Sequence, residues 1–211
     1  NAELALPVPN PFIPDELELK ATANPAQLGE IHPEHILQAP HIDLWHQLDT
    51  SFNVPRASLY IAMHSPIANN SPRHSLLTSL LTGIINKQLN SYAYPARLAG
   101  LNYSISPTER GLTLSLSGYN QKQPVLLERI IAALKAPEIT TKRFNILKAR
   151  YQQKLSNAKK QQPFHQVLAE LKRSLVERHW TNEQKLAALS TVTPEDLTNF
   201  SKQFLKQLHI T

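Results

Sequence analysis

The stretch Leu89-Asn-Ser-Tyr-Ala-Tyr-Pro-Ala-Arg-Leu-Ala-Gly-Leu-Asn-Tyr103 and the shorter stretch Gly118-Tyr-Asn-Gln-Lys-Gln-Pro124 bracket the most regular pattern in this chain of 211 residues. Between them, apolar and small polar residues alternate over 101–106 and again over 112–117. This two-residue period is typical of strands with one packed face and one wet face. The pattern therefore predicts an antiparallel β-hairpin, and neither bracketing stretch contains an obvious catalytic group.

A long helix is predicted before this hairpin. Ser71 is a favourable N-cap, and Pro72 suits the first helical position. Apolar residues then recur at helical spacing, namely Leu76, Leu77, Leu80, Leu81, Ile84, Ile85 and Leu89. We expect this helix to be the central core element, with Asn90–Tyr103 connecting it to the hairpin.

Strands are also expected over 42–48 and 57–63, and the chain after the hairpin reads as helical. Helices are predicted over 125–135, from 141 to about 160, from Pro163, from the capping box Thr181–Gln184, and from Thr193-Pro194. The last helix should bury Leu197, Phe200, Phe204 and Leu205. The resulting order predicts an α+β fold of two layers, in which helices cover one face of a mostly antiparallel sheet.

The chain divides into an N-terminal arm and one domain. Residues 3–30 carry Pro7, Pro9, Pro11 and Pro14, so they are expected to form an extended, Pro-rich linker or arm lying across a neighbouring domain. Residues 31–211 are expected to form a single α+β domain. Asn1-Ala2 resembles the remnant of a removed tag.

Composition excludes several classes of site. The chain has no cysteine, which excludes disulfides and thiolate metal sites, and its few glycines lack the spacing of a phosphate loop. A net charge of +6 permits anionic partners without requiring them. The basic residues after position 140 are predicted to be a solvated helix face, with polyanion contact as the alternative: Lys142, Arg143, Lys148, Arg150, Lys154, Lys159 and Lys160. We expect neither a membrane nor nucleic acid as a partner.

The histidine motifs do not support a metal or catalytic site. His32 and His35 are three residues apart, whereas a helical zinc site needs ligands four apart, and Pro33 lies between them. We therefore predict a polar loop there. His64 with Ser65, and His74 with Ser75, are interpreted as surface polar residues because no further triad signal accompanies them.

Several strings, in order along the chain, carry a resemblance to a known family. They include Leu6-Pro7-x-Pro9-Asn10-x-Phe12-Ile13-Pro14, Leu44-Trp45-His46, Asn90-x-Tyr92-Ala93-Tyr94-x-Ala96-x-Leu98-Ala99-Gly100, Gly118-Tyr119-Asn120-x-Lys122-Gln123-Pro124, Gln162-Pro163 and Trp180-Thr181. From Leu6 to its end the chain resembles the middle region of the pitrilysin/insulinase family of zinc metalloendopeptidases.

The resemblance implies that the catalytic zinc site and this region belong to different domains of the parent protein. Proteases of this family have four similar α+β domains that close around a peptide, and a His-x-x-Glu-His motif in the first domain holds zinc. This chain resembles the third domain, a catalytically silent copy whose segment Leu76 to Ile85 lies where the zinc helix would be. We therefore expect no catalytic residue, metal ligand or cofactor in this fragment, which should be inactive alone, and zinc only in the parent protein.

The expected partners are the other domains of the same parent chain and the parent's peptide substrate. The small polar face of the hairpin is the candidate for the chamber wall: Ser104, Ser106, Thr113, Ser115 and Ser117. The alternative is a free-standing peptide- or polyanion-binding module, although Leu208-His-Ile-Thr211 reads as the start of a strand cut short. The sequence leaves the parent's compartment open between periplasm and cytoplasm.

Overall fold

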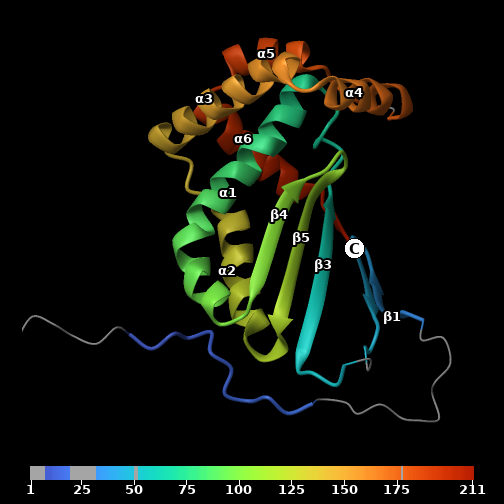
Figure 1. Cartoon of the computed structure of the whole chain (residues 1–211), viewed down its shortest axis with the longest axis vertical. Coiled ribbons are helices and arrows are strands. Elements are labelled where there is room, and N and C mark those ends of the chain that lie inside the picture. Colours follow the sequence, from blue (N-terminus) through green and yellow to red (C-terminus); the bar gives the residue numbers. More distant parts are fainter. Residues whose placement is uncertain (1–7, 20–31, 50–51, 177) are drawn as a thin grey trace, which may run out of the picture.

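The computed structural model describes residues 8–19, 32–49, 52–176 and 178–211 (Figure 1). The suggested tag remnant at 1–2 lies outside these residues, as does the proposed arm apart from 8–19. Within the described ranges, no helix is both long enough and apolar enough to cross a bilayer.

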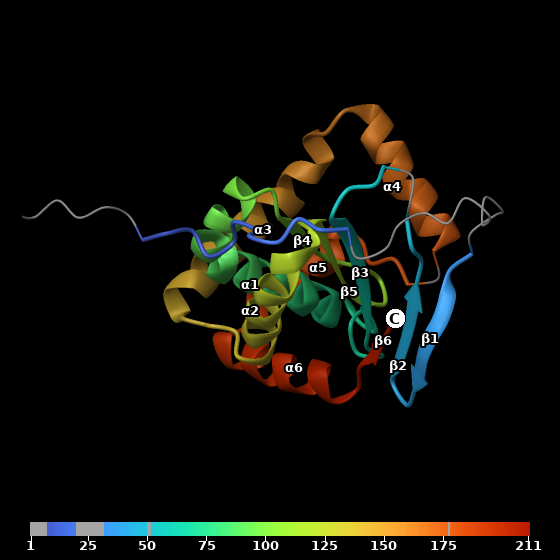
Figure 2. The same cartoon turned by 90° about the horizontal axis from the view of Figure 1, so that it is seen from below.

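A six-stranded sheet organises the domain, with strand order β1-β2-β6-β3-β5-β4. The strands are β1 (Glu34–Ala39), β2 (Ile42–His46), β3 (Arg56–His64), β4 (Asn102–Pro107), β5 (Gly111–Tyr119) and β6 (His209–Ile210). All neighbouring strands run antiparallel except β2 and β6, which are parallel. The helices pack on one face of this sheet, which confirms the predicted α+β fold (Figures 1 and 2).

The helices are α1 (Pro72–Leu98), α2 (Gln123–Lys135), α3 (Thr141–Asn157), α4 (Pro163–Leu175), α5 (Asn182–Thr191) and α6 (Pro194–Lys206), with short 3₁₀ turns at Asn120–Lys122 and Ala158–Lys160. The N-cap predicted for α1 is confirmed, because the Ser71 side chain accepts a hydrogen bond from the His74 main-chain N–H. The capping boxes at the starts of α5 and α6 are also present. These caps satisfy main-chain donors that the first helical turn leaves unpaired.

Helix α1 is longer than its apolar stripe predicts. Asn90–Leu98 belongs to the helix, so the prediction of a connection over all of Asn90–Tyr103 is wrong. Pro95 lies in the last turn of this helix, where its missing N–H leaves one main-chain hydrogen bond unmade. The connection itself is only the turn at Ala99–Leu101, where the Leu101 N–H donates to Ala96 O at 2.9 Å.

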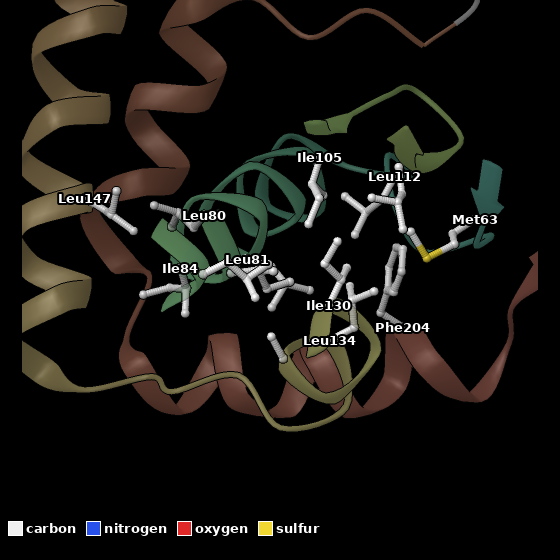
Figure 3. Close-up of a cluster of buried hydrophobic side chains, with 14 of the residues drawn as sticks. Met63, Leu80, Leu81, Ile84, Ile105, Leu112, Ile130, Leu134, Leu147 and Phe204 are labelled. Atoms are coloured by element: carbon white, nitrogen blue, oxygen red, sulfur yellow. The ribbon is translucent and has the colours of Figure 1, made fainter. Parts of the chain in front are cut away.

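The core fills the space between the sheet and helices α1, α2 and α6 (Figure 3). Leu80, Ile84 and Ile130 have no exposed surface, and Leu112 of β5 is 1% exposed. Phe204 is fully buried on α6, while Leu205 is only partly buried and packs against the edge of the core. The predicted burial of Leu197, Phe200 and Phe204 is thus confirmed and that of Leu205 is not.

Strand β1 corrects the interpretation of residues 32–35 as a loop. Residues 34–39 pair with β2 through a tight turn at Pro40-His41, where His41 has a φ of 72°. The His35 and Trp45 rings stack with centroids 4.3 Å apart. Residues 34–39 form a strand because they pair with β2, and their polar local sequence does not indicate this strand.

The described part of the arm packs on the two stretches that bracket the hairpin. Phe12 is 1% exposed and meets the Tyr92 ring edge-on, with centroids 5.4 Å apart. Asn10 Nδ2 donates to Pro95 O at 2.8 Å, and the Asp15 N–H donates to Gln121 Oε1 at 2.9 Å. Residues 8–19 therefore pack against the same domain that contains the hairpin.

Candidate functional site

The predicted polar face is present on the two hairpin strands. Ser104 and Ser106 on β4 are exposed, and Thr113, Ser115 and Ser117 on β5 are partly exposed. Ser104 pairs with Ser115, and Ser106 pairs with Thr113. The alternate residues of β5, including Leu114 and Leu116, are 1% exposed on the helix side.

Strand β3 extends this face beyond the hairpin. Ser58 pairs with Ser117, Tyr60 with Ser115 and Ala62 with Thr113, so these residues lie on the same side of the sheet. Tyr60 is 73% exposed and lies among small side chains, while the larger pair Arg56 and Tyr119 occupies the same face at the start of β3. The sequence analysis did not include β3 in this face, because only the strand order shows that it lies beside β5.

The start of α1 cannot supply a metal site. Residues Leu76, Leu77, Leu80, Leu81, Ile84 and Ile85 lie in the core. His74 Nδ1 is within hydrogen-bonding distance of Asn70 Oδ1 and lies 3.1 Å from Ser71 Oγ, and its ring stacks on Phe200. Burial lowers the pKa of His74, and Arg73 lowers it further. The residues at this position therefore do not fit a zinc ion, since the helix offers it only one imidazole.

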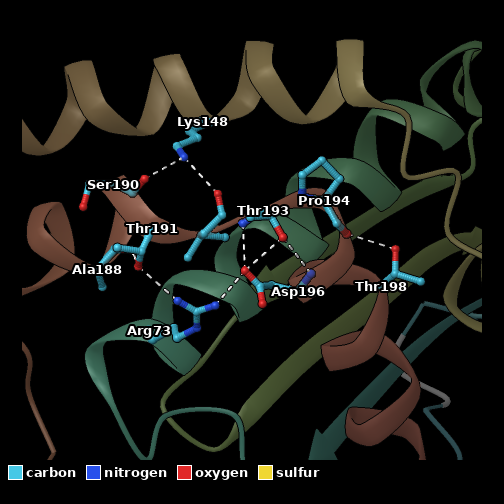
Figure 4. A network of polar contacts seen from close by, with 10 residues as sticks. Arg73, Lys148, Ala188, Ser190, Thr191, Thr193, Pro194, Asp196 and Thr198 are labelled. Carbon is cyan, nitrogen blue, oxygen red and sulfur yellow. Dashed lines mark hydrogen bonds and ion pairs between the residues drawn. The ribbon is translucent and has the colours of Figure 1, made fainter.

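One basic residue of the predicted polyanion set contacts the segment where α5 ends and α6 begins (Figure 4). Lys148 Nζ donates to Val192 O at 2.9 Å and to Ser190 O at 3.3 Å. Arg73 of α1 forms an ion pair with Asp196 at 2.6 Å. Lys148 is thus a structural residue that satisfies carbonyl groups at the end of α5.

The other basic residues that were predicted to contact a polyanion differ in their surroundings. Arg143 pairs with Glu138, whereas Lys142 and Lys160 are exposed. Arg150 and Lys154 meet Lys87 of α1 around a hollow of about 430 Å³. The side chain of Lys159 lies outside the described part of the structure. The structure therefore brings Arg150 and Lys154 together at this hollow and places four other members of the set elsewhere: Lys142, Arg143, Lys148 and Lys160.

A second hollow region lies at the end of the sheet below α4. Two adjoining cavities, of about 780 and 700 Å³, share His64, Asn69, Glu109, Arg110 and Arg178. Ser65 lines the larger cavity and is only 5% exposed, so its interpretation as a surface residue is wrong. We call this region the end cleft.

Sequence reasoning missed the end cleft because its walls come from distant segments. The Ser65 N–H donates to Arg110 O at 2.8 Å, and Asn69 Nδ2 donates to Arg178 O at 2.8 Å. The adjacent pair His64-Ser65 at a strand end was the one local signal.

The sheet and its helical cover define a two-layer α+β domain. The crystal structure of pitrilysin contains this fold, with a TM-score of 0.83 over 98% of this chain and 22% of that one, at 21% identity. Residues 1–188 match the family model described as the middle or third domain of peptidase M16. The chain belongs to this family of M16 middle domains.

Curated proteins of similar sequence support the same family assignment. The chain is 37% identical over 213 residues to the insulin-degrading enzyme of Homo sapiens and 36% identical over 209 residues to that of Drosophila melanogaster. These alignments cover 100% and 99% of this chain, but only 20% and 21% of the relatives. The chain therefore spans about a fifth of the length of the curated relatives that it matches.

Proposed function

We propose that this domain is a non-catalytic structural part of a zinc-dependent metalloendopeptidase and forms one wall of the chamber that encloses the peptide. The observation that carries the proposal is the uncovered polar face of β3, β5 and β4. Its side chains are small hydroxyl groups around Tyr60, which suits contact with varied peptide sequences. The zinc and its ligands would belong to another domain of the parent chain.

The hydroxyl groups of the two hairpin strands support the proposal, although Arg56 places a charge at the start of β3 on the same face. Ser104, Ser106, Thr113, Ser115 and Ser117 can donate or accept hydrogen bonds without imposing a charge preference on a peptide. A chamber that encloses many sequences needs such a surface. The expected partners are the remaining domains of the parent chain and its peptide substrate.

Photocrosslinking in the full-length parent tests this orientation. A Ser104→Cys variant, free of other reactive cysteines and labelled with benzophenone maleimide, should crosslink to bound peptide. Gln153→Cys on α3 is the matched control, because Gln153 is exposed on a helix away from this face. Crosslinking at position 153 that equals or exceeds that at 104 would contradict the proposed orientation.

Activity of the isolated chain tests the non-catalytic assignment separately. We expect no zinc-dependent peptide hydrolysis, because α1 buries the residues that face the sheet. Hydrolysis that persists after repurification and disappears on chelation would overturn the assignment.

A second candidate function rests on the hollow between α1 and α3. Lys87, Arg150 and Lys154 surround it, and none of the three has an ion-pair partner among the described residues. Such a cluster suits a polyanion, whose affinity would fall as salt rises. This role corresponds to the binding-module alternative and is compatible with the structural role.

A further inference from the structure

We propose that the end cleft binds a ligand in which a carboxylate group is attached to an apolar chain or side chain. The residues that line the cleft come from the end of β3, the turn before β5, the end of α4 and the segment that leads into β6. This ligand site goes beyond the structural role and does not depend on which way the polar face points.

Cationic and imidazole side chains at the ends of neighbouring strands line the cleft. His64 pairs with Gly111 of β5 on one side and with His209 of β6 on the other. Arg110 directly precedes Gly111, so its guanidinium is carried to the same strand ends. The His64 and His209 rings lie with centroids 6.4 Å apart. The sheet register therefore gathers these groups from segments that are far apart in sequence.

The charge balance of the larger cavity favours an anion. Arg110, Arg178 and Lys206 line it, and Glu109 is its only carboxylate among the described lining residues. None of the three cations has an ion-pair partner within the described residues. Guanidinium groups are well suited to a carboxylate, because their planar N–H donors match its two oxygens.

Two buried polar atoms at the cleft lack partners. Ser65 Oγ and His64 Nδ1 are inaccessible to solvent and make no hydrogen bond in the described structure. Buried polar groups are normally paired, because an unpaired one costs about 1–3 kcal/mol. Ser65 is 5% exposed and lines the cavity, so its unpaired hydroxyl is a candidate donor to a bound anion.

His64 contributes an imidazole to the lining of both cavities. Burial lowers the pKa of its imidazole, and the charges of Arg110 and His209 lower it further. A carboxylate placed among these groups would oppose both charges, so binding should raise the pKa of His64.

The other residues that line the larger cavity indicate that the ligand also has an apolar part. Pro66, Leu175, Val176 and Leu208 contribute to the same cavity. Leu175 is 76% exposed at the end of α4, and Leu171 one turn earlier is 50% exposed. A volume of about 780 Å³ lies within the usual range for small-molecule pockets. The carboxylate could come from a peptide C-terminus or from a free aliphatic acid.

A titration followed by NMR of the histidine side chains tests the proposal with the present chain. The probes are octanoate and N-acetyl-leucyl-leucine, each compared with its uncharged amide. We expect the two acids to shift the His64 and His209 resonances saturably, and the amides to bind at least tenfold more weakly. Tighter binding of the dipeptide would indicate a peptide C-terminus, and tighter binding of octanoate a free aliphatic acid.

Variants locate the site. Arg110→Ala should weaken binding of the acid about tenfold, which corresponds to about 1.4 kcal/mol. Arg178→Ala is a second variant with the same expectation, and Lys142→Ala removes an equal charge from the exposed face of α3 as the control. Amides that bind as well as the acids, unchanged affinity in both arginine variants, or no saturable shift at millimolar probe would each overturn the proposal.

Discussion

Replacement of Gly118 by alanine should destabilise the domain strongly. Gly118 has a φ of +130°, and a Cβ built there would lie 2.3 Å from Gly100 O and 3.0 Å from Leu101 Cα. The backbone conformation alone costs an L-residue about 1–3 kcal/mol. The contact involves main-chain atoms, so it can be relieved only by moving the turn after α1 away from β5. We expect a total loss of at least about 3 kcal/mol.

Gly83→Ala is the matched control within the same domain. Its Cβ would lie 3.2 Å from Leu147 Cδ1, which is the flexible end of a side chain, and the site is inside α1. Alanine gains about 1 kcal/mol of helix propensity over glycine, which offsets the crowding. The control should therefore change stability by less than about 1 kcal/mol.

Urea unfolding followed by circular dichroism measures both variants. A loss of about 3 kcal/mol corresponds to a fall in Tm of roughly 6–12 °C for a domain of this size. If Gly118→Ala were as stable as Gly83→Ala, the close approach between the two stretches would not constrain the fold, and the reasoning would be refuted.

Three further predictions concern other parts of the molecule. Phe12→Ala removes a side chain that is 1% exposed and should expose the arm to limited proteolysis, whereas Val8→Ala, at a 90% exposed side chain, should not; equal cleavage rates would contradict this. The pKa of Asp196 is lowered by the Thr193 main-chain N–H and by Arg73, so its stabilising contribution is present above pH 3.8 and is lost as the pH falls below it. Asp196→Asn should therefore flatten the acid limb of the stability curve, and an unchanged limb in acid unfolding would contradict the assignment. Lys154→Ala should reduce retention on immobilised heparin more than Lys142→Ala does, because only Lys154 lines the hollow beside α1; equal retention of the two variants would argue against a localised site.

Local patterns predicted much of the secondary structure. The alternation over 101–106 and 112–117 is the pattern observed in β4 and β5, and the caps at Ser71, Thr181 and Thr193 mark true helix starts. These signals are reliable because strand alternation and cap hydrogen bonds involve residues only a few positions apart. Strand β1 and the last turns of α1 are not predicted, because β1 is defined by its pairing with β2, and residues 90–98 contain Pro95 and lack the large apolar residues of the preceding stripe at their buried positions Ala93 and Ala96.

Patterns within the chain are enough to predict the α+β class, the hairpin with its polar face, and the absence of zinc-binding spacing in helix α1. The three-dimensional arrangement adds that Tyr60 joins that face, that Phe12 packs on Tyr92, and that Arg110, His64 and His209 meet at one cleft. The strand order β6-β3-β5 brings together side chains that are far apart in the chain, such as His64 and His209, which are 145 positions apart (209 − 64). Periodicity reports which face of an element is buried, but it carries no information about which distant element lies beside it.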